Sequence, residues 1–306
     1  MTKTDLSNVE DLLMMYMNVD STTGKEGSFG NLVNENLVDN GWIVEKQQLD
    51  GDPSRFNLLA TRKPLAEKAP LIVFNTHIDT VPPYIPPTWD KMSIYGRGSN
   101  DAKGQLACMV SAAQFLVESH PAVADRLALL FVVGEEVDHI GMTKANDFVG
   151  LNPDYLIVGE PTEMKFATIQ KGALKVIIRC KGIAGHSGYP SQGKSAIHML
   201  IPVLNDILNY EWPSDAVLGK SWHILAEFYG FRSCLLSKSV QRIFSEVRLV
   251  YVICVKHVEI EGKYLFGAGS IKNAHSKDEF VPKKELHDYR QALISLAIKL
   301  CSNSSA

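Results

Sequence analysis

Apolar and polar positions alternate along the chain with two different spacings. Residues 8–20 and 29–40 place apolar side chains three and four positions apart, which predicts two amphipathic helices. Residues 42–48 and 56–62 have the composition of strands. Three later segments are almost continuously apolar, as is typical of strands covered on both faces. They are residues 69–79, 126–136 and 154–160.

An Ala-rich segment with helical spacing, residues 103–120, lies between the first and second of these apolar strands. Strands and helices therefore alternate along the first half of the chain. This order predicts an α/β fold, with a mostly parallel sheet flanked by helices in three layers.

The pattern changes after residue 164. Residues 166–183 predict a hairpin with interleaved polar and apolar positions, and an amphipathic helix is expected from Ser195 onward. Residues 216–264 contain strand-like pieces but few turn signals. We therefore expect an inserted α+β domain. The predicted division is residues 1–164 and 264–306 for the main domain and residues 165–263 for the inserted domain.

Composition and charge narrow the function classes. A chain of 306 residues with 45% hydrophobic content can form one large domain or two ordinary ones. A net charge of -3 gives no basic excess for a nucleic-acid partner. The N-terminal segment resembles neither a signal peptide nor a membrane span, so a cytoplasmic protein is expected. Five scattered cysteines without a CxxC pair predict reduced structural thiols.

Side chains that can bind metal follow each of the three apolar strands. His77 and Asp79 end the first strand, Glu135 and Glu136 end the second, and Glu160 ends the third. Because ligands bind at the carboxyl ends of strands in open α/β sheets, we expect these side chains to converge. A single His at a strand end is more often a core residue, but three such endings in one sheet favour a metal centre.

Two further candidates lie in loops that are rich in small residues. Asp101 follows two glycines and precedes the helix at 103–120, so it can cap that helix, reach the metal centre, or do both. His275 lies in a Gly-rich loop that can approach a ligand closely. Two histidines with several carboxylates suit zinc, cobalt or manganese rather than calcium. A pair of ions would need a shared carboxylate, and the adjacent Glu135 and Glu136 can divide metal binding and proton transfer between them.

The order of these motifs resembles a family of zinc-dependent deacylases and exopeptidases. The motifs are HID at residue 77, GRGSNDAKG at 96, GEE at 134, GEPT at 159 and FGAGSIKNAH at 266. The family includes acetylornithine deacetylase, succinyl-diaminopimelate desuccinylase, aminoacylase and glutamate carboxypeptidases. GEPT and the last motif look most like the acetylornithine deacetylase branch, which acts in arginine biosynthesis. The resemblance covers residues 5–220 and returns near Tyr264.

The resemblance implies two zinc ions per chain, with cobalt as an alternative. The implied metal ligands are His77, Asp101, Glu136, Glu160 and His275. Asp101 would bridge the two ions. His77 and Glu160 would complete one site, and Glu136 and His275 would complete the other.

The resemblance also implies three catalytic roles. Asp79 would orient His77 through its free ring nitrogen. Glu135 would be the general base that carries a proton from the zinc-bound water to the leaving amine. His186, in the motif GIAGHSGYPSQGKSAI, would stabilise the oxyanion from a lid domain, commonly across subunits, which implies a homodimer.

The chain departs from the family between His186 and His275, where the lid domain is shorter than the resemblance predicts. Three readings of function follow. The first is a zinc-dependent amidohydrolase that removes an acetyl group from an amino acid such as N-acetylornithine. The second is a metallo-carboxypeptidase or dipeptidase with the same centre and a short peptide substrate. The third is a relative that binds metal without catalysis because its lid is incomplete.

Overall fold

The computed structural model describes residues 4–67, 69–167, 178–212, 214–216, 219–220 and 260–303. The chain divides into two compact units. The first comprises Met1–Thr168 and Ile253–Ala306, and the second comprises Ile169–Val252. The second unit is inserted in the first, so the first is built from two distant parts of the sequence.

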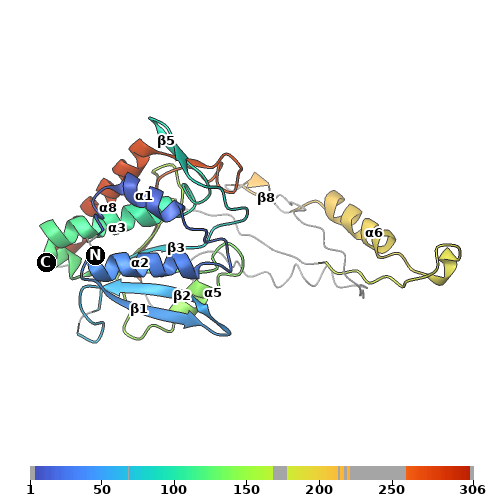
Figure 1. The fold of residues 1–306 in the computed structure, drawn as a ribbon, viewed down its shortest axis with the longest axis horizontal. Coiled ribbons are helices and arrows are strands. Elements are labelled where there is room, and N and C mark those ends of the chain that lie inside the picture. The colour runs from blue at the N-terminus through green and yellow to red at the C-terminus, as the bar shows by residue number, and fades with distance from the viewer. Residues whose placement is uncertain are drawn as a thin grey trace. The chain divides into compact units, whose positions relative to one another are not determined.

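A six-stranded sheet lies at the centre of the first unit (Figure 1). Its strand order is β1-β2-β6-β3-β7-β10. The strands are β1 (Ile43–Leu49), β2 (Asp52–Thr61), β6 (Leu127–Val132), β3 (Ile72–His77), β7 (Tyr155–Val158) and β10 (Gly262–Leu265). Strands β6, β3, β7 and β10 are parallel, whereas β1 and β2 pair antiparallel at one edge. The prediction of an α/β fold with a mostly parallel sheet is confirmed.

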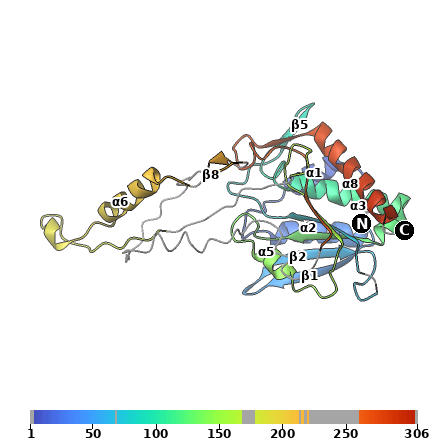
Figure 2. The ribbon, with the colours of Figure 1, turned by 180° about the vertical axis from the view of Figure 1, so that it is seen from behind.

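Helices pack on both faces of this sheet (Figures 1 and 2). The helices of the first unit are α1 (Val9–Met17), α2 (Gly27–Asp39), α3 (Lys103–Ser119), α4 (Pro121–Ala124), α5 (Ile140–Ala145) and α8 (Lys283–Asn303). All of them except α5 contribute to one large hydrophobic core, and α5 contributes to a smaller core on the opposite face. These layers position the carboxyl ends of β3, β6 and β7 at one edge of the unit.

Strand side chains alternate between the two cores, which explains why the strands are apolar throughout. In β3, Ile72 and Phe74 point into the large core, and Val73 points into the small one. In β6, Leu129 belongs to the large core and Leu130 to the small one. Because successive strand residues face opposite sides, a sheet covered on both faces requires an uninterrupted apolar run.

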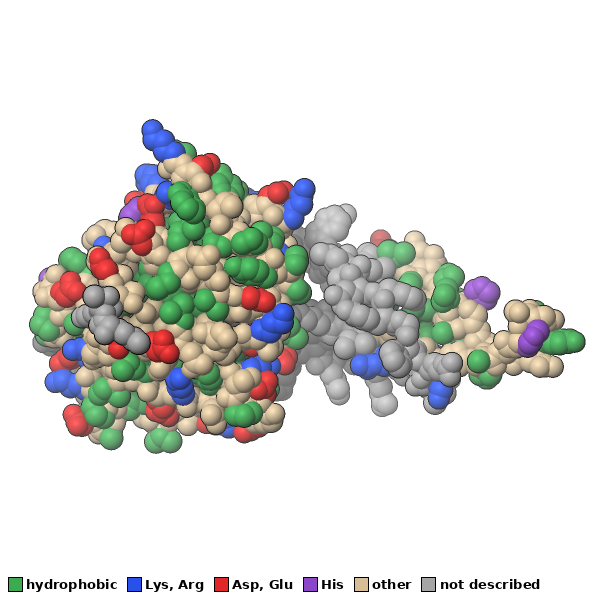
Figure 3. Space-filling model, in the orientation of Figure 1, with side chains coloured by type: hydrophobic (Ala, Val, Ile, Leu, Met, Phe, Trp, Pro, Cys, Tyr) green, Lys and Arg blue, Asp and Glu red, His purple; other side chains and the backbone are tan. Residues whose placement is uncertain are grey.

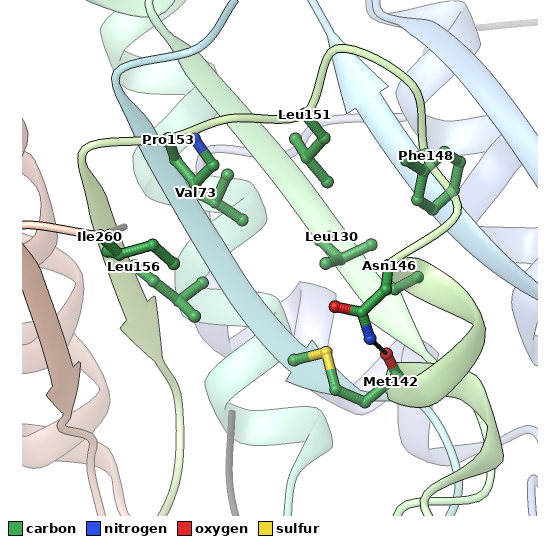
Figure 4. Close-up of a pocket in the computed structure, with 10 residues that line it drawn as sticks. Val73, Leu130, Met142, Asn146, Phe148, Leu151, Pro153, Leu156 and Ile260 are labelled. Carbon is green, nitrogen blue, oxygen red and sulfur yellow. Dashed lines mark hydrogen bonds between the residues drawn. The ribbon is translucent and has the colours of Figure 1, made fainter. Parts of the chain in front are cut away.

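The small core encloses an apolar cavity of about 60 Å³ (Figure 4). Val73, Leu130 and Leu156 line it from the sheet, and Met142 and Phe148 line it from α5 and the loop that follows. The amide of Asn146 donates a hydrogen bond to the Met142 carbonyl oxygen at 3.2 Å and so closes the end of α5.

A second, three-stranded sheet joins two distant segments of the first unit. It has the order β11-β5-β4, with β4 at Thr88–Trp89, β5 at Ser93–Tyr95 and β11 at Phe280–Pro282. Phe280 pairs with Tyr95. The sheet therefore places the loop before β11 beside the loop after β5.

The second unit contains the 3-10 helix Pro190–Gln192 (η1), the helix Ala196–Asn209 (α6), and the short strands Ser214–Asp215 (β8) and Gly219–Lys220 (β9). Ser195 caps α6, because its hydroxyl accepts the N–H of His198 at 3.2 Å, as predicted. The predicted hairpin at 166–183 and the ambiguous segment 216–264 lie mostly outside the described residues. The role of this unit as a lid stays a prediction.

Acidic and basic side chains are interspersed over the face of the first unit seen in Figure 3. No helix among the described residues is long and apolar enough to cross a lipid bilayer.

Candidate metal centre

The ends of three parallel strands bring the predicted side chains together. β3 ends at His77, Glu135 follows β6, and Glu160 follows β7. The Nε2 atom of His77 lies 3.7 Å from Glu160 Oε1 and 4.0 Å from Glu135 Oε2. Because β6, β3 and β7 are neighbours in register, strand ends far apart in the sequence meet at one point.

Asp101 lies between two histidines. Its Oδ1 atom is 2.9 Å from His77 Nε2, and its Oδ2 atom is 3.3 Å from His275 Nε2. The helix α3 has Ala102 at its N-cap without a side-chain cap, so the interpretation of Asp101 as a helix cap is wrong. A carboxylate whose two oxygens face two different ligands has the arrangement that a bridge between two ions requires.

Glu136 lies on the His275 side of this bridge. Its Oε2 atom is 3.0 Å from His275 Nε2. His77, Asp101 and Glu136 each contribute one ligand atom to a group whose atoms all lie within 4.8 Å of one another. The candidates therefore form two groups around Asp101, with His77 and Glu160 in one and Glu136 and His275 in the other.

Burial and close charges shift the pKa values of these groups. Burial raises the pKa of Glu160 well above its usual value, and the nearby Asp101 charge adds to the shift. Burial likewise raises the pKa of Glu136. Hydrogen bonds to Asp101 and Glu136 raise the pKa of His275 to about 10. Burial of Asp101 acts to raise its pKa, but hydrogen bonds from His275 and His77 outweigh burial and lower it overall.

Burial is the main cause of the raised pKa values of Glu160 and Glu136. Contacts between carboxylates and imidazoles cause the pKa shifts of Asp101 and His275. The site therefore concentrates carboxylate charge in little space. Protons on the histidines offset that negative charge, and divalent cations would offset it in their place. Two imidazoles and three carboxylates form a donor set of the kind that zinc and related transition metals take. The residues thus fit a metal pair, and their individual roles as ligands stay predictions.

Asp79 contacts both the ring of His77 and the turn after β6. The Nδ1 atom of His77 is 2.9 Å from the main-chain oxygen of Asp79 and 3.5 Å from the carboxylate Oδ1. The carboxylate also accepts the N–H of Glu135 at 3.0 Å and the N–H of Glu136 at 3.2 Å. Asp79 therefore fixes the turn that carries both glutamates as well as the ring of His77.

Sequence reasoning missed several residues that support the centre. Thr23 donates a hydrogen bond to Asp79 Oδ2 at 2.8 Å. The Nδ1 atom of His139 lies 3.5 Å from Glu135 Oε1. Arg97 and Glu279 form a buried ion pair beside Asp101. His139, Arg97 and Glu279 lie in or beside the recognised motifs, which was a usable signal, whereas no local pattern marks Thr23.

His186 lies in the second unit. It is exposed, and its Nδ1 atom accepts the N–H of Gly188 at 3.0 Å. Its ring centroid lies 5.7 Å from that of Tyr189. Its predicted role in stabilising an oxyanion stays a prediction.

Comparison with known proteins shows similarity to peptidases. The profile of peptidase family M20/M25/M40 matches residues 73–299. A protein of Paracoccidioides brasiliensis named probable carboxypeptidase is 39% identical over 205 residues, which cover 61% of this chain and 46% of that protein. A peptidase M20 domain-containing protein of Schizosaccharomyces pombe is 27% identical over an alignment of 329 positions, which covers 92% of this chain and 82% of that protein.

A solved structure shows the same fold. A tripeptidase of Staphylococcus aureus superposes with a TM-score of 0.60 at 16% identity, covering 98% of this chain and 99% of its own. The chain spans about half the length of the curated carboxypeptidase relatives that it matches.

Proposed function

The chain belongs to peptidase family M20/M25/M40, and we propose that it hydrolyses an amide bond of a short peptide or an N-acyl amino acid with the help of two divalent cations. One observation carries this proposal: the two oxygens of Asp101 each face a different histidine, His77 and His275. Such a carboxylate can hold two ions close together. Glu160 beside His77 and Glu136 beside His275 supply a further ligand on each side.

Zinc is the ion that this donor set suits best, and cobalt shares its preference for nitrogen and oxygen ligands. Bound there, the ions would polarise the amide carbonyl and lower the pKa of an attacking water. His77 is almost fully buried and His275 is half exposed, so the His275 side of the centre is the more open to substrate.

Glu135 is the proposed general base. Its side chain is about one fifth exposed and lies at the edge of the metal centre, 4.0 Å from His77 Nε2. The Asp79 carboxylate holds its main-chain N–H, which limits the positions that the side chain can reach. Glu135 would take a proton from the attacking water and donate it to the leaving amine.

Two substrate classes have specific support. The relatives named probable carboxypeptidase support a peptide that is cleaved beside its C-terminal residue. The GEPT motif at residue 159 and the final motif support an N-acetyl amino acid such as N-acetylornithine. Both substrates place the scissile amide next to an amino acid with a free carboxylate. A role for His186 at the carbonyl oxygen, and a homodimer that would supply it, belong to the same proposal.

A substrate panel tests the proposal. The purified chain, loaded with zinc or cobalt, would be assayed for amine release from N-acetyl-L-ornithine, other N-acetyl amino acids and dipeptides, beside Glu135→Ala. Each substrate would be paired with its C-terminal amide, which lacks the free carboxylate. We expect turnover of at least one acid substrate, none of its amide, and none by the variant. A chain that binds two ions but is silent on the whole panel would support the metal-binding reading instead.

A further inference from the structure

A buried ion pair joins the two segments that carry Asp101 and His275. The side chains of Arg97 and Glu279 are only 2% and 0% exposed, and Arg97 Nη1 donates to Glu279 Oε2. Glu279 directly precedes β11, which pairs with β5, and Arg97 follows β5 by two residues. The ion pair therefore stands where the loop before β11 meets the loop after β5.

The carboxylate of Glu279 binds the main chain that leads to Asp101. Its Oε1 atom accepts three N–H groups, from Gly98 at 3.0 Å, Asn100 at 3.2 Å and Asp101 at 3.1 Å. Three N–H groups that converge on one oxygen form a concave anion site and fix the loop's conformation. The third donor is the main-chain amide of Asp101. Glu279 therefore fixes the backbone from which the Asp101 carboxylate extends.

Arg97 binds the main chain at His275 in the same way. Its Nη2 atom donates to the His275 carbonyl oxygen at 3.4 Å, and its Nη1 atom donates to the Ser276 oxygen at 3.1 Å. His275 has a φ of 62°, a left-handed conformation that costs free energy for a residue with a Cβ. Such a residue keeps its conformation only where surrounding contacts hold it, and Arg97 supplies two such contacts.

The two loops also approach each other closely nearby. A Cβ atom built on Gly269 would lie 1.8 Å from Asn100 Oδ1. The amide of Asn100 donates to the Ser270 carbonyl oxygen at 2.9 Å. The two loops are therefore tightly packed against each other, so a small displacement of one loop would displace the other.

We propose that Arg97 and Glu279 are a positioning pair that sets the separation of Asp101 and His275, and thereby the affinity of the His275 and Glu136 side for its metal ion. The inference rests on the proposed function. His77 ends β3 and Glu160 follows β7, and the pairing of these strands does not involve the ion pair. Asp101 is shared by both sides, but only the His275 side also depends on Arg97. Loss of the pair should therefore weaken the ion beside His275 more than the ion beside His77.

Titration with cobalt, followed by absorption and by counting bound metal, tests this on the full chain. The parent should bind two ions. In Glu279→Gln, which disrupts the link to Arg97, we expect the second ion to bind about 10 to 100 times more weakly while the first changes little. Arg97→Lys keeps a cation beside Glu279 but lacks the planar fork that reaches two carbonyl groups, so it should give a smaller loss. Arg97→Lys can also replace Glu279→Gln in this titration if Glu279→Gln does not fold.

A matched control separates positioning from general stability. Arg290 donates to the Ser111 hydroxyl oxygen at 2.7 Å, between α8 and α3, and neither residue belongs to the two loops. Arg290→Met should leave both metal affinities unchanged. If it weakens the second ion as much as Glu279→Gln does, or if Glu279→Gln changes neither affinity, the positioning role is overturned.

Hydrogen exchange in EDTA provides a readout that does not need metal. The amides of Gly98, Asn100 and Asp101 should exchange faster in Glu279→Gln than in the parent, because they lose their shared carboxylate. Unchanged exchange would show that Glu279 does not hold this loop. A parent that binds no metal would instead overturn the proposed function, and the exchange rates would still decide whether the pair fixes the Asp101 segment.

Discussion

Thr23 donates a hydrogen bond from its Oγ1 atom to Asp79 Oδ2 at 2.8 Å, across 56 positions of sequence. The same carboxylate holds the main-chain N–H groups of Glu135 and Glu136. One buried side chain therefore connects the loop between α1 and α2, the end of β3 and the turn after β6. Asp79 accepts these hydrogen bonds only as a carboxylate, because an amide in its place would present an N–H₂ group to a donor.

Asp79→Asn should therefore displace the general base. We expect kcat to fall about 100-fold with little change in KM, since small misplacements of a catalytic group cost rates of this order. Thr23→Val removes one hydrogen bond, worth about 1 kcal/mol of stability, and should lower kcat less. Steady-state kinetics on the best substrate, with metal content measured on each variant, would check both. Wild-type kcat in Asp79→Asn would contradict the role of Asp79 as the organiser of this turn.

The same isosteric substitution should have different effects at Glu135 and Glu136. Glu135→Gln should keep both metal ions and lose about 10²- to 10⁴-fold in kcat, because the amide cannot accept the proton of the attacking water. Glu136→Gln should lose metal first, since Glu136 lies 3.0 Å from His275 and belongs to the ligand group. Metal analysis beside turnover separates the two. Metal loss in Glu135→Gln would exchange the roles assigned to the neighbours.

Local sequence patterns predicted the frame of the centre better than its contacts. The buried strands β3 and β6 were recognisable because each needs an unbroken apolar run to face two cores. The interpretation of Asp101 as an N-cap was wrong because the local sequence contains no information about a contact with a residue as distant as His275. The hydrogen bond from Thr23 to Asp79 likewise joins distant segments and leaves no periodic signal. The roles of the ligands and of His186 were predicted from the resemblance, and they await the measurements proposed above.

Because His275 is protonated in the metal-free protein, stability and metal affinity should change in opposite directions with pH. Its pKa is raised from about 6.5 to about 10 by Asp101 and Glu136. In EDTA, the stability from this pairing is fully present below pH 6.5 and is lost as pH rises through 10. Metal must displace the proton, so zinc affinity should increase over the same range. Urea unfolding of the parent and His275→Gln in EDTA, beside zinc titrations, would check both trends. A parent advantage that does not shrink with pH would contradict the assignment.

Metal removal should destabilise the first unit. The carboxylates of Asp101, Glu136 and Glu160 lie close together, and bound cations would neutralise their repulsion. Zinc at 100 times its dissociation constant should add about 2.7 kcal/mol per site relative to EDTA. Thermal unfolding at several zinc concentrations would measure this. A melting temperature independent of zinc would contradict a metal site formed by the fold, and Asp101→Asn should reduce the dependence.

Lys103 provides a pH-dependent stability test within the first unit. It is almost fully buried, and its Nζ atom donates to the Tyr16 oxygen at 3.1 Å and the Val19 oxygen at 2.6 Å. Burial lowers its pKa from 10.5 to about 7. Between pH 7 and 10.5 the unfolded chain therefore binds more protons at this residue than the folded chain, and the contribution of Lys103 to stability rises with pH. Below pH 7 the lysine is charged in both states, so the cost of burying that charge is fully present.

Comparing the parent with Lys103→Met separates the pH-dependent stability due to Lys103 from that due to His275, which has the opposite sign. In EDTA, the free energy of unfolding of the parent should increase relative to that of the variant as pH rises from 7 toward 10. Urea unfolding at several pH values in this window would measure the difference. Lys283→Met is the control, because Lys283 forms its ion pair with Glu10 nearer the surface and away from this site. A difference between parent and Lys103→Met that stays constant with pH would show that burial does not change the charge of Lys103.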